Sequence, residues 1–193
     1  EPCIPLSKWL KDKVEERQNS DQSREELNKS IVQEITWGIK CILSGLNFLH
    51  TQANLGHGYL GLHAIFVTPN GDWKIGSFDL ACNISLHEDE TFFKRYNAYL
   101  GNQYMSPERA NIDRGDILFR KAFGVIDIFS LARVIEESFS ILSVQVPGNF
   151  DKYLKKMSSA EFLKRPSAKQ LMNCQLFSTE YIKLMESLSE NKA

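Results

Sequence analysis

A run of regularly spaced apolar residues between Ile31 and His50 constrains the fold more than any other feature of this sequence. The apolar positions recur in steps of three or four, which is the spacing of one face of an α-helix. Those positions are Ile31, Ile35, Ile39, Ile42, Leu46 and Leu49, and the face is widened by Trp37, Leu43 and Phe48. A helix with so broad an apolar face must be covered by other elements, so we expect it to be deeply buried in a folded domain.

The segment before this helix divides into two parts. Residues 6–17 alternate apolar and charged positions in the manner of a short amphipathic helix. Residues 18–29 are polar and charged and have no apolar face, so they predict an exposed polar loop.

A β-hairpin is predicted after the long helix. Two strand-like runs, 62–68 and 73–78, flank the turn sequence Pro69-Asn70-Gly71-Asp72. Asn-Gly between such runs is a strong hairpin signal, because both residues tolerate positive φ angles.

The second half of the chain is predicted to be mostly helical. Residues 82–103 show no clean periodicity and predict a long loop, whereas residues 125–142 predict a second buried helix. Residues 165–172 predict a short helix with its proline near the beginning. The sequence therefore predicts one domain over residues 1–193, mainly α with a small β-hairpin, which is the α+β class.

The charge of the chain limits the partners it can have. Lys and Arg number 23 and Asp and Glu number 24, and the basic residues do not form a continuous block. This near-neutral balance gives no electrostatic case for binding nucleic acid or an anionic membrane. A hydrophobic content of 42% is enough for a sizeable core.

The spacing of the cysteines and the length of the apolar runs argue against a zinc-binding protein and against a membrane-spanning one. Cys3, Cys41, Cys82 and Cys174 form no C-x-x-C pair and no zinc-type cluster with histidine, so we expect buried, reduced thiols in a cytosolic protein and no metal site. No apolar run reaches the ~18 residues of a membrane span. No signal peptide is visible, and the opening EPCIPLSKWL is expected to be the middle of a domain.

The stretch Gly56-His57-Gly58-Tyr59-Leu60-Gly61 formally matches the phosphate-binding pattern G-x-G-x-x-G. A dinucleotide-binding loop should follow a strand and open a helix, so that the phosphates meet the helix N-terminus. Here the order is reversed, because the stretch follows a long helix and leads into a hairpin. The context therefore argues against phosphate binding at these glycines.

A different pattern fits the same order of elements. HGYLGLHAIF, from His57 to Phe66, aligns with the protein-kinase catalytic loop H-R-D-L-x-x-x-N, and residues 74–81 (KIGSFDLA) lie where K-I-x-D-F-G-L-A would follow. YMSPE at 104–108 resembles the A-P-E motif, DIFS at 127–130 resembles D-x-W-S, and RP at 165–166 resembles a late R-P pair. With five landmarks in order, the chain resembles the C-terminal lobe of a protein kinase. The resemblance implies that the chain starts near the hinge and lacks the small N-terminal lobe with its ATP loop.

The residues at the chemical positions of this pattern have been replaced. The catalytic Asp, which accepts the substrate hydroxyl proton, is Tyr59, and a phenol is a poor base at neutral pH. The magnesium-binding Asn is Ala64, and the magnesium-binding Asp of D-F-G is Ser77, a weak ligand for a hard cation. The Gly of D-F-G is Asp79, and the Arg of H-R-D is Gly58. The resemblance thus implies a pseudokinase that has no catalytic residue and no metal site, and in which this fragment binds neither ATP nor Mg²⁺.

The architectural positions are retained. The resemblance implies that Glu108 and Arg165 form a buried salt bridge and that Asp127 bonds backbone groups of the catalytic loop. His57 is expected to be a satisfied core histidine and not a base. Phe92 and Phe93, in the predicted loop, are expected to pack inward, with a partner-binding patch as the alternative.

Two stretches point to one pseudokinase family. The opening PL-x-x-WL at 5–10 and GDWKIG at 71–76 resemble the Scy-like pseudokinases, although this chain carries Tyr59-Leu60 where relatives have Asn-Val. The resemblance implies a protein-interaction scaffold in vesicle trafficking, cytoplasmic and Golgi-associated, with coat or trafficking proteins as partners.

Three alternatives remain open. The first is a divergent active kinase that uses Asp79 in a rebuilt site, although Asp79 lies two residues, roughly 6–7 Å, beyond the normal position. The second is a helical interaction domain with chance kinase landmarks, which predicts no contact between Glu108 and Arg165. The third is magnesium-independent nucleotide binding in a structural role.

Overall fold

The structure is a computed structural model that describes residues 2–83, 102–111 and 118–177. Its elements are β1 (Ile4–Pro5), α1 (Leu6–Asn19), α2 (Arg24–Thr51), β2 (Leu55–Gly56), η1 (Leu62–Ala64), β3 (Ile65–Val67), β4 (Trp73–Ile75), η2 (Phe78–Leu80), β5 (Cys82–Asn83), η4 (Asn102–Tyr104), α4 (Pro107–Ala110), α5 (Leu118–Ile141), α6 (Gly148–Met157), η6 (Phe162–Lys164), α7 (Ala168–Met172) and η7 (Gln175–Phe177), where η denotes a 3₁₀ helix.

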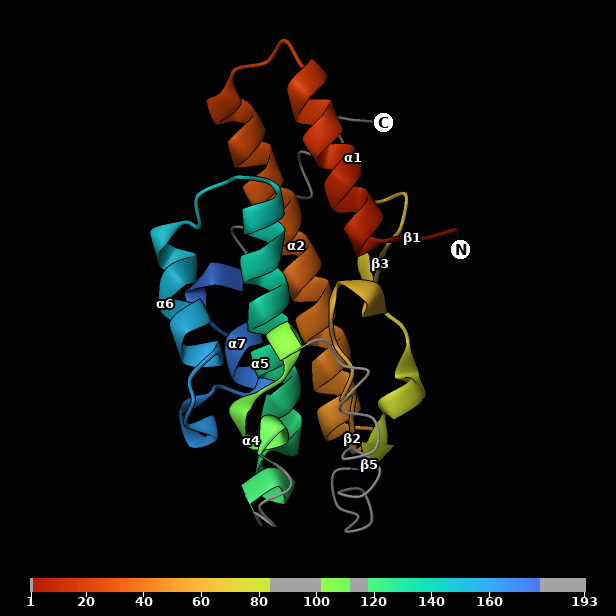
Figure 1. Cartoon of the computed structure of the whole chain (residues 1–193), viewed down its shortest axis with the longest axis vertical. Helices are drawn as coiled ribbons and strands as arrows, with labels where there is room; N and C mark the ends of the chain where they lie inside the picture. Colours follow the sequence, from red (N-terminus) through yellow and green to blue (C-terminus); the bar gives the residue numbers. More distant parts are fainter. Residues whose placement is uncertain (1, 84–101, 112–117, 178–193) are drawn as a thin grey trace.

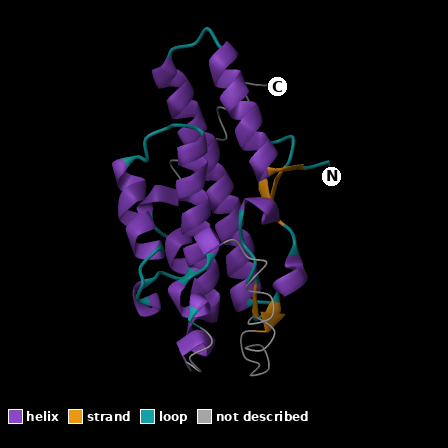
Figure 2. Ribbon diagram, viewed as in Figure 1, coloured by secondary structure: helices purple, strands orange, loops and turns teal. Residues whose placement is uncertain are grey.

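Helices dominate the described chain, as the sequence predicted, and two small sheets complete an α+β fold (Figure 2). The long helices α1, α2 and α5 run roughly along the length of the molecule (Figure 1). Helix α2 contacts α5 and α7, while α5 also contacts α1 and α6. The core lies between these helices, and α2 and α5 each contribute more buried apolar side chains than any other described element.

Helix α2 contains the predicted helix 31–50 and buries its apolar stripe. Ile35, Ile42, Leu43 and Leu46 are fully shielded from solvent. The stripe is narrower than predicted, because Phe48 is 60% exposed. Burial of four large aliphatic side chains stabilises the packed helix by about 1.5–3 kcal/mol each relative to exposure.

The polar loop predicted at 18–29 is shorter than the sequence suggested. Helix α1 continues to Asn19 and α2 begins at Arg24, so only residues 20–23 connect them. Ser23 caps α2: its side-chain oxygen accepts a hydrogen bond from the Glu26 amide at 3.3 Å, and its hydroxyl donates to the Glu26 carboxylate at 2.9 Å. The prediction was wrong because it relied on an apolar face, whereas a capped, solvent-exposed first turn needs none.

The predicted hairpin is present as the antiparallel pair β3 and β4. Ile65 pairs with Ile75 and Val67 with Trp73, and β1 adds a third strand through Ile4 and Val67. The strands are shorter than the predicted runs 62–68 and 73–78. Residues 62–64 form a 3₁₀ turn, and the left-handed backbone of Ser77 ends the second strand.

The hairpin turn is fixed and docked onto α2. Gly71 has a φ of +85°, which fits the glycine of the predicted turn, and the Thr68 amide donates to the Asp72 carbonyl at 2.9 Å. Trp37 on α2 donates its indole N–H to the Asp72 carboxylate at 2.9 Å. Trp73 is buried against the same helix. These contacts hold the hairpin, and with it the segment that follows, at a fixed place beside α2.

The remaining predicted helices are also present. Helix α5 begins earlier than the predicted 125 and ends at Ile141, and α7 covers 168–172 with a capping box between Ser167 and Gln170 just after Pro166. Most of the predicted loop 82–103, including Phe92 and Phe93, lies outside the described residues, so the expectations for these two side chains stay predictions.

Two expectations from composition can be compared with the described chain. None of the four cysteines, all of which the structure describes, forms a disulfide. The prediction that they are buried was wrong, because Cys3 is exposed and the other three are half-buried. Among the described helices, none combines the length and the apolarity that a bilayer crossing requires.

Candidate functional site

A buried aspartate, Asp127 on α5, organises the segment that connects α2 to the hairpin. Its carboxylate accepts hydrogen bonds from the backbone amides of His57 and Gly58, both at 2.8 Å. It also lies 2.9 Å from the ring nitrogen Nε2 of His50, at the end of α2. One carboxylate thus joins α5, α2 and the segment at 57–58.

Asp127 is held in its ionised form by these contacts. Burial alone would raise the pKa of Asp127, but the hydrogen bonds from His50 and from the His57 amide outweigh it and hold the pKa below its usual value. A fully buried carboxylate with three donors is a structural anchor, since a buried charge is tolerated only when it is paired and hydrogen-bonded.

His57 itself is fully buried and both ring nitrogens are engaged. Its Nδ1 accepts a hydrogen bond from the Tyr59 amide at 3.2 Å, and its Nε2 lies 2.8 Å from the Gly76 carbonyl. An acceptor role for Nδ1 assigns the proton to Nε2, which donates to Gly76. The ring of Phe78 packs edge-on at a centroid distance of 5.1 Å. His57 therefore bridges residues 57–59 to the strand end at 76–78 and has no free lone pair for proton transfer.

A buried cation, Arg109 on α4, lies at the same segment. Its guanidinium donates a hydrogen bond to the carbonyl oxygen of Gly58. Burial is the main cause of the pKa of Arg109 being lowered to about 10, and the negative charge of Asp127 opposes that effect. Arg109 stays protonated at neutral pH and contributes a positive charge beneath residue 58.

The positions at which the kinase pattern has lost its catalytic and metal-binding residues offer few polar groups for chemistry. Tyr59 is half-exposed, and its ring lies against that of His63 at a centroid distance of 4.3 Å. Ala64 is fully buried in η1. Ser77 has a left-handed backbone at φ +56°, and Asp79 lies exposed on η2. The described residues contain no group of three or more His, Cys, Asp and Glu side chains arranged to hold a metal ion.

Glu108 and Arg165, which the sequence analysis paired, are in contact. Arg165 donates to the two carboxylate oxygens of Glu108 at 2.5 and 2.8 Å. Its Nε donates to the Ser159 carbonyl at 2.8 Å, and its guanidinium lies over the Phe129 ring at 4.9 Å. Both charged side chains are almost completely buried, at 0% and 7% exposure. The pair ties α4 to the segment between α6 and α7.

Sequence reasoning identified Asp127, His57, Glu108 and Arg165 but missed two members of the site. Arg109 follows Glu108 directly, yet a lone arginine on a four-residue helix carries no signal of burial. His50 ends the long helix, where a histidine is also expected as a solvated C-terminal residue. Only the packing of α2 and α4 against α5 assigns both residues to the same polar cluster.

The fold and the cluster define a mainly helical α+β protein whose buried polar groups brace backbone segments. No family model matches the chain. Over 74 residues, 38% of this chain, it is 35% identical to "Probable inactive serine/threonine-protein kinase scy1" of Dictyostelium discoideum. Over 163 residues, 80% of this chain, it is 26% identical to the mouse protein named "Protein-associating with the carboxyl-terminal domain of ezrin".

These similarities are partial. The matched stretches make up 9% and 22% of the two relatives, so the chain spans only a small part of each. They give loose support to a relation with inactive, Scy1-type kinases.

Proposed function

We propose that this chain is the C-terminal lobe of a pseudokinase, which works as a protein-interaction scaffold and does not transfer phosphate. One observation carries the proposal. The buried anchors around Asp127 and Glu108 are intact, whereas the neighbouring positions 59, 64 and 77 offer no base and no carboxylate for a metal.

The absence of a proton acceptor supports the non-catalytic part of the proposal. Phosphoryl transfer to a hydroxyl needs a carboxylate that orients the nucleophile. Tyr59 supplies a phenol, which donates a proton more readily than it accepts one at neutral pH. His57 cannot substitute, because its acceptor nitrogen is already bonded to the Tyr59 amide.

The weak metal chemistry supports it as well. Mg²⁺ prefers carboxylate oxygens together with water and phosphate. Ala64 has no side-chain oxygen, and Ser77 offers a neutral hydroxyl. Asp79 is the one carboxylate of residues 74–81, and it lies exposed on η2 beyond the left-handed Ser77.

The partners follow from resemblance and from the relatives' names. The Scy-like resemblance favours coat or trafficking proteins and a cytoplasmic, Golgi-associated site of action. The name of the mouse relative adds the C-terminal domain of ezrin as a defined partner to assay. We propose that the chain binds proteins of these kinds.

The test is a thermal-shift titration of the full-length gene product with ATP, with and without Mg²⁺, beside an active kinase as positive control. We expect no magnesium-dependent stabilisation. The Asp79→Asn variant is measured in parallel. A shift that requires Mg²⁺ and disappears in Asp79→Asn would overturn the proposal and establish a divergent kinase with a rebuilt site. A shift without Mg²⁺ would indicate nucleotide as a structural ligand.

Partner binding is measured separately, by calorimetric titration of the same protein with the purified C-terminal domain of ezrin. Binding would support the scaffold role. If neither this domain nor purified coat proteins bind, the scaffold role loses its support, even if the protein also fails to bind ATP.

A further inference from the structure

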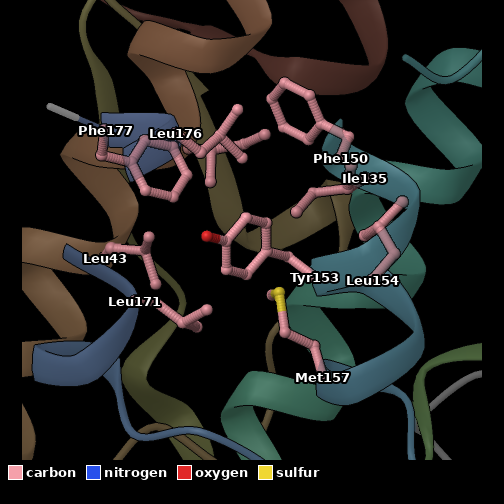
Figure 3. Close-up of a pocket in the computed structure, with 10 residues that line it drawn as sticks. Leu43, Ile135, Phe150, Tyr153, Leu154, Met157, Leu171, Leu176 and Phe177 are labelled. Atoms are coloured by element: carbon pink, nitrogen blue, oxygen red, sulfur yellow. The ribbon is translucent and has the colours of Figure 1, made fainter. Parts of the chain in front are cut away.

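One face of helix α6 is buried in the hydrophobic core. Phe150, Leu154 and Met157, spaced as one helical stripe, are buried. Figure 3 shows them, together with Tyr153, directed toward a small cavity that α2, α5 and α7 close from the other sides. The cavity measures about 10 Å³ and its walls are apolar, so it has no room for a ligand and is a feature of core packing.

The opposite face of α6 is basic. Lys152, Lys155 and Lys156 are all exposed. At 3.6 residues per turn, these three lysines fall within roughly 100° of the helix circumference, centred opposite the buried stripe. Lys155 forms an ion pair with Asp151 at 2.6 Å. Lys152 and Lys156 form no ion pair with any residue that the structure describes, so their charges face solvent.

The segment after α6 adds an exposed apolar side chain next to further lysines. Leu163, in the 3₁₀ turn η6, is 83% exposed. Lys164 follows it and pairs with Glu161 at 2.6 Å, and Lys169 is exposed on α7. No other large hydrophobic side chain in the described chain is as exposed as Leu163.

This part of the chain differs in charge from the whole. Residues 148–177 contain six basic and two acidic side chains, a net charge of +4, whereas the complete chain has a net charge of −1. Arg165 is buried against Glu108, so every exposed basic side chain of the stretch is a lysine. Helix α6 forms one margin of the molecule, on the side away from β1 and β3 (Figure 1).

We propose that the outward face of α6 and the Leu163 turn form a docking surface for an anionic lipid bilayer. Lysines near an anionic leaflet are attracted to it, and each one increases the partition coefficient of the protein onto the membrane by roughly fivefold. The exposed Leu163, in the turn that follows α6 along the chain, supplies the second, apolar signal that stable peripheral binding requires.

The composition of the face favours a lipid surface over an acidic protein. Protein–protein interfaces are enriched in arginine and aromatic residues and depleted in lysine. Here the exposed cations are lysines alone, and those of α6 lie on the face opposite its buried stripe. Mobile point charges suit a diffuse layer of headgroups, whereas an acidic peptide is better held by planar arginine pairs.

The sequence alone argued against an anionic membrane, because the chain is almost neutral and its basic residues are scattered. Folding changes that conclusion. The apolar stripe of α6 turns inward, and this leaves its lysines together on one face. The inference does not depend on the kinase resemblance or on the proposed scaffold role.

The test is co-sedimentation of the full-length gene product with vesicles of phosphatidylcholine containing about 30% phosphatidylserine, and with vesicles of phosphatidylcholine alone. We expect binding to the anionic vesicles that weakens as salt is raised above about 0.1 M. The triple substitution Lys152→Gln, Lys155→Gln and Lys156→Gln should weaken binding on the order of 100-fold.

Matched controls separate the effect of the α6 lysines from the effect of the net charge of the protein. The triple substitution Lys8→Gln, Lys11→Gln and Lys29→Gln removes the same charge from exposed sites on α1 and α2 and should leave binding nearly unchanged. Leu163→Gln should weaken binding by about tenfold at unchanged charge. Thermal melting checks that each variant is folded.

Three results would overturn the proposal. The first is equal binding to both kinds of vesicle, or to neither. The second is an equal loss in the two lysine triples, which would mean that only net charge matters. The third is retention on immobilised polyglutamate without vesicle binding, which would assign the face to an acidic protein.

Discussion

Glu108 and Arg165 are 57 positions apart in the sequence, and in the folded chain they form a buried ion pair with two parallel hydrogen bonds. The pair joins the short helix α4 to the segment between α6 and α7. Arg165 also donates to the carbonyl oxygens of Ser159 and Val125, so nearly all of its donors are used. The contact differs from what the chance-landmark alternative predicted, which was that these two residues would not meet.

Replacing one partner of this pair should destabilise the protein strongly. Arg165→Ala leaves the Glu108 carboxylate buried without a counter-charge, and we expect a loss of about 3–5 kcal/mol in the free energy of unfolding. The measurement is urea unfolding followed by circular dichroism. Glu136→Gln is the matched control, because Glu136 pairs with Arg133 at 2.5 Å on the surface and should contribute less than about 1 kcal/mol. Similar losses in both variants would contradict the structural role of the buried pair.

Asp127→Asn should destabilise the protein at neutral pH. The neutral amide accepts weaker hydrogen bonds from the His57 and Gly58 amides than the carboxylate does, and we expect a loss of about 2–3 kcal/mol. Asp21→Asn, at an exposed position between α1 and α2, serves as the control and should change the free energy of unfolding very little.

The same carboxylate predicts a pH dependence. Its folded-state pKa lies below the unfolded value of about 3.9, so its contribution to stability is present above that pH. The contribution is lost as the pH falls from about 4 through the folded-state pKa. Wild type should therefore lose stability more steeply than Asp127→Asn between pH 5 and strong acid, as measured by urea midpoints. Parallel pH profiles for the two proteins would show that Asp127 is not a stabilised anion.

Gly38→Ala should destabilise α2, although alanine is the better helix former. A Cβ atom at residue 38 would lie 2.1–2.5 Å from the buried indole of Trp73, which cannot move aside without disturbing the core. We expect a net loss of about 1–3 kcal/mol. Gly148→Ala, at the first residue of α6 where a Cβ meets nothing within 4 Å, should be neutral or slightly stabilising in the same thermal melts. A gain in stability at both positions would argue against the close contact of α2 with Trp73.

Cys41 should react slowly with iodoacetamide. Burial raises the pKa of its thiol and the Asp72 carboxylate adds to the effect, so less thiolate is present at a given pH. Cys3, which is exposed, is the internal comparison. Peptide mass spectrometry of a labelling time course at pH 8 should show Cys3 modified before Cys41. Faster labelling of Cys41 would mean that α2 opens near the hairpin.

Sequence patterns predicted the secondary structure well where a local pattern has a local cause. The spacing of isoleucine and leucine between Ile31 and Leu46 predicted α2, because burial of a helix requires that period. Asn70-Gly71 predicted the hairpin, because the turn needs a residue that accepts positive φ. The landmark residues suggested the contacts of Asp127 and Glu108 only through resemblance, since nothing local in the chain brings them to their partners.

The other features depend on how the helices pack against one another. Arg109 and His50 join the Asp127 cluster because α4 and α2 pack beside α5, and no periodicity records that packing. The lysines of α6 gather on one outward face because Phe150 and Leu154 turn inward, whereas the net charge of the chain gave no hint of a basic surface. Local propensity acts between neighbours in sequence, but burial and electrostatics act between neighbours in space, and these are known only once the chain has folded.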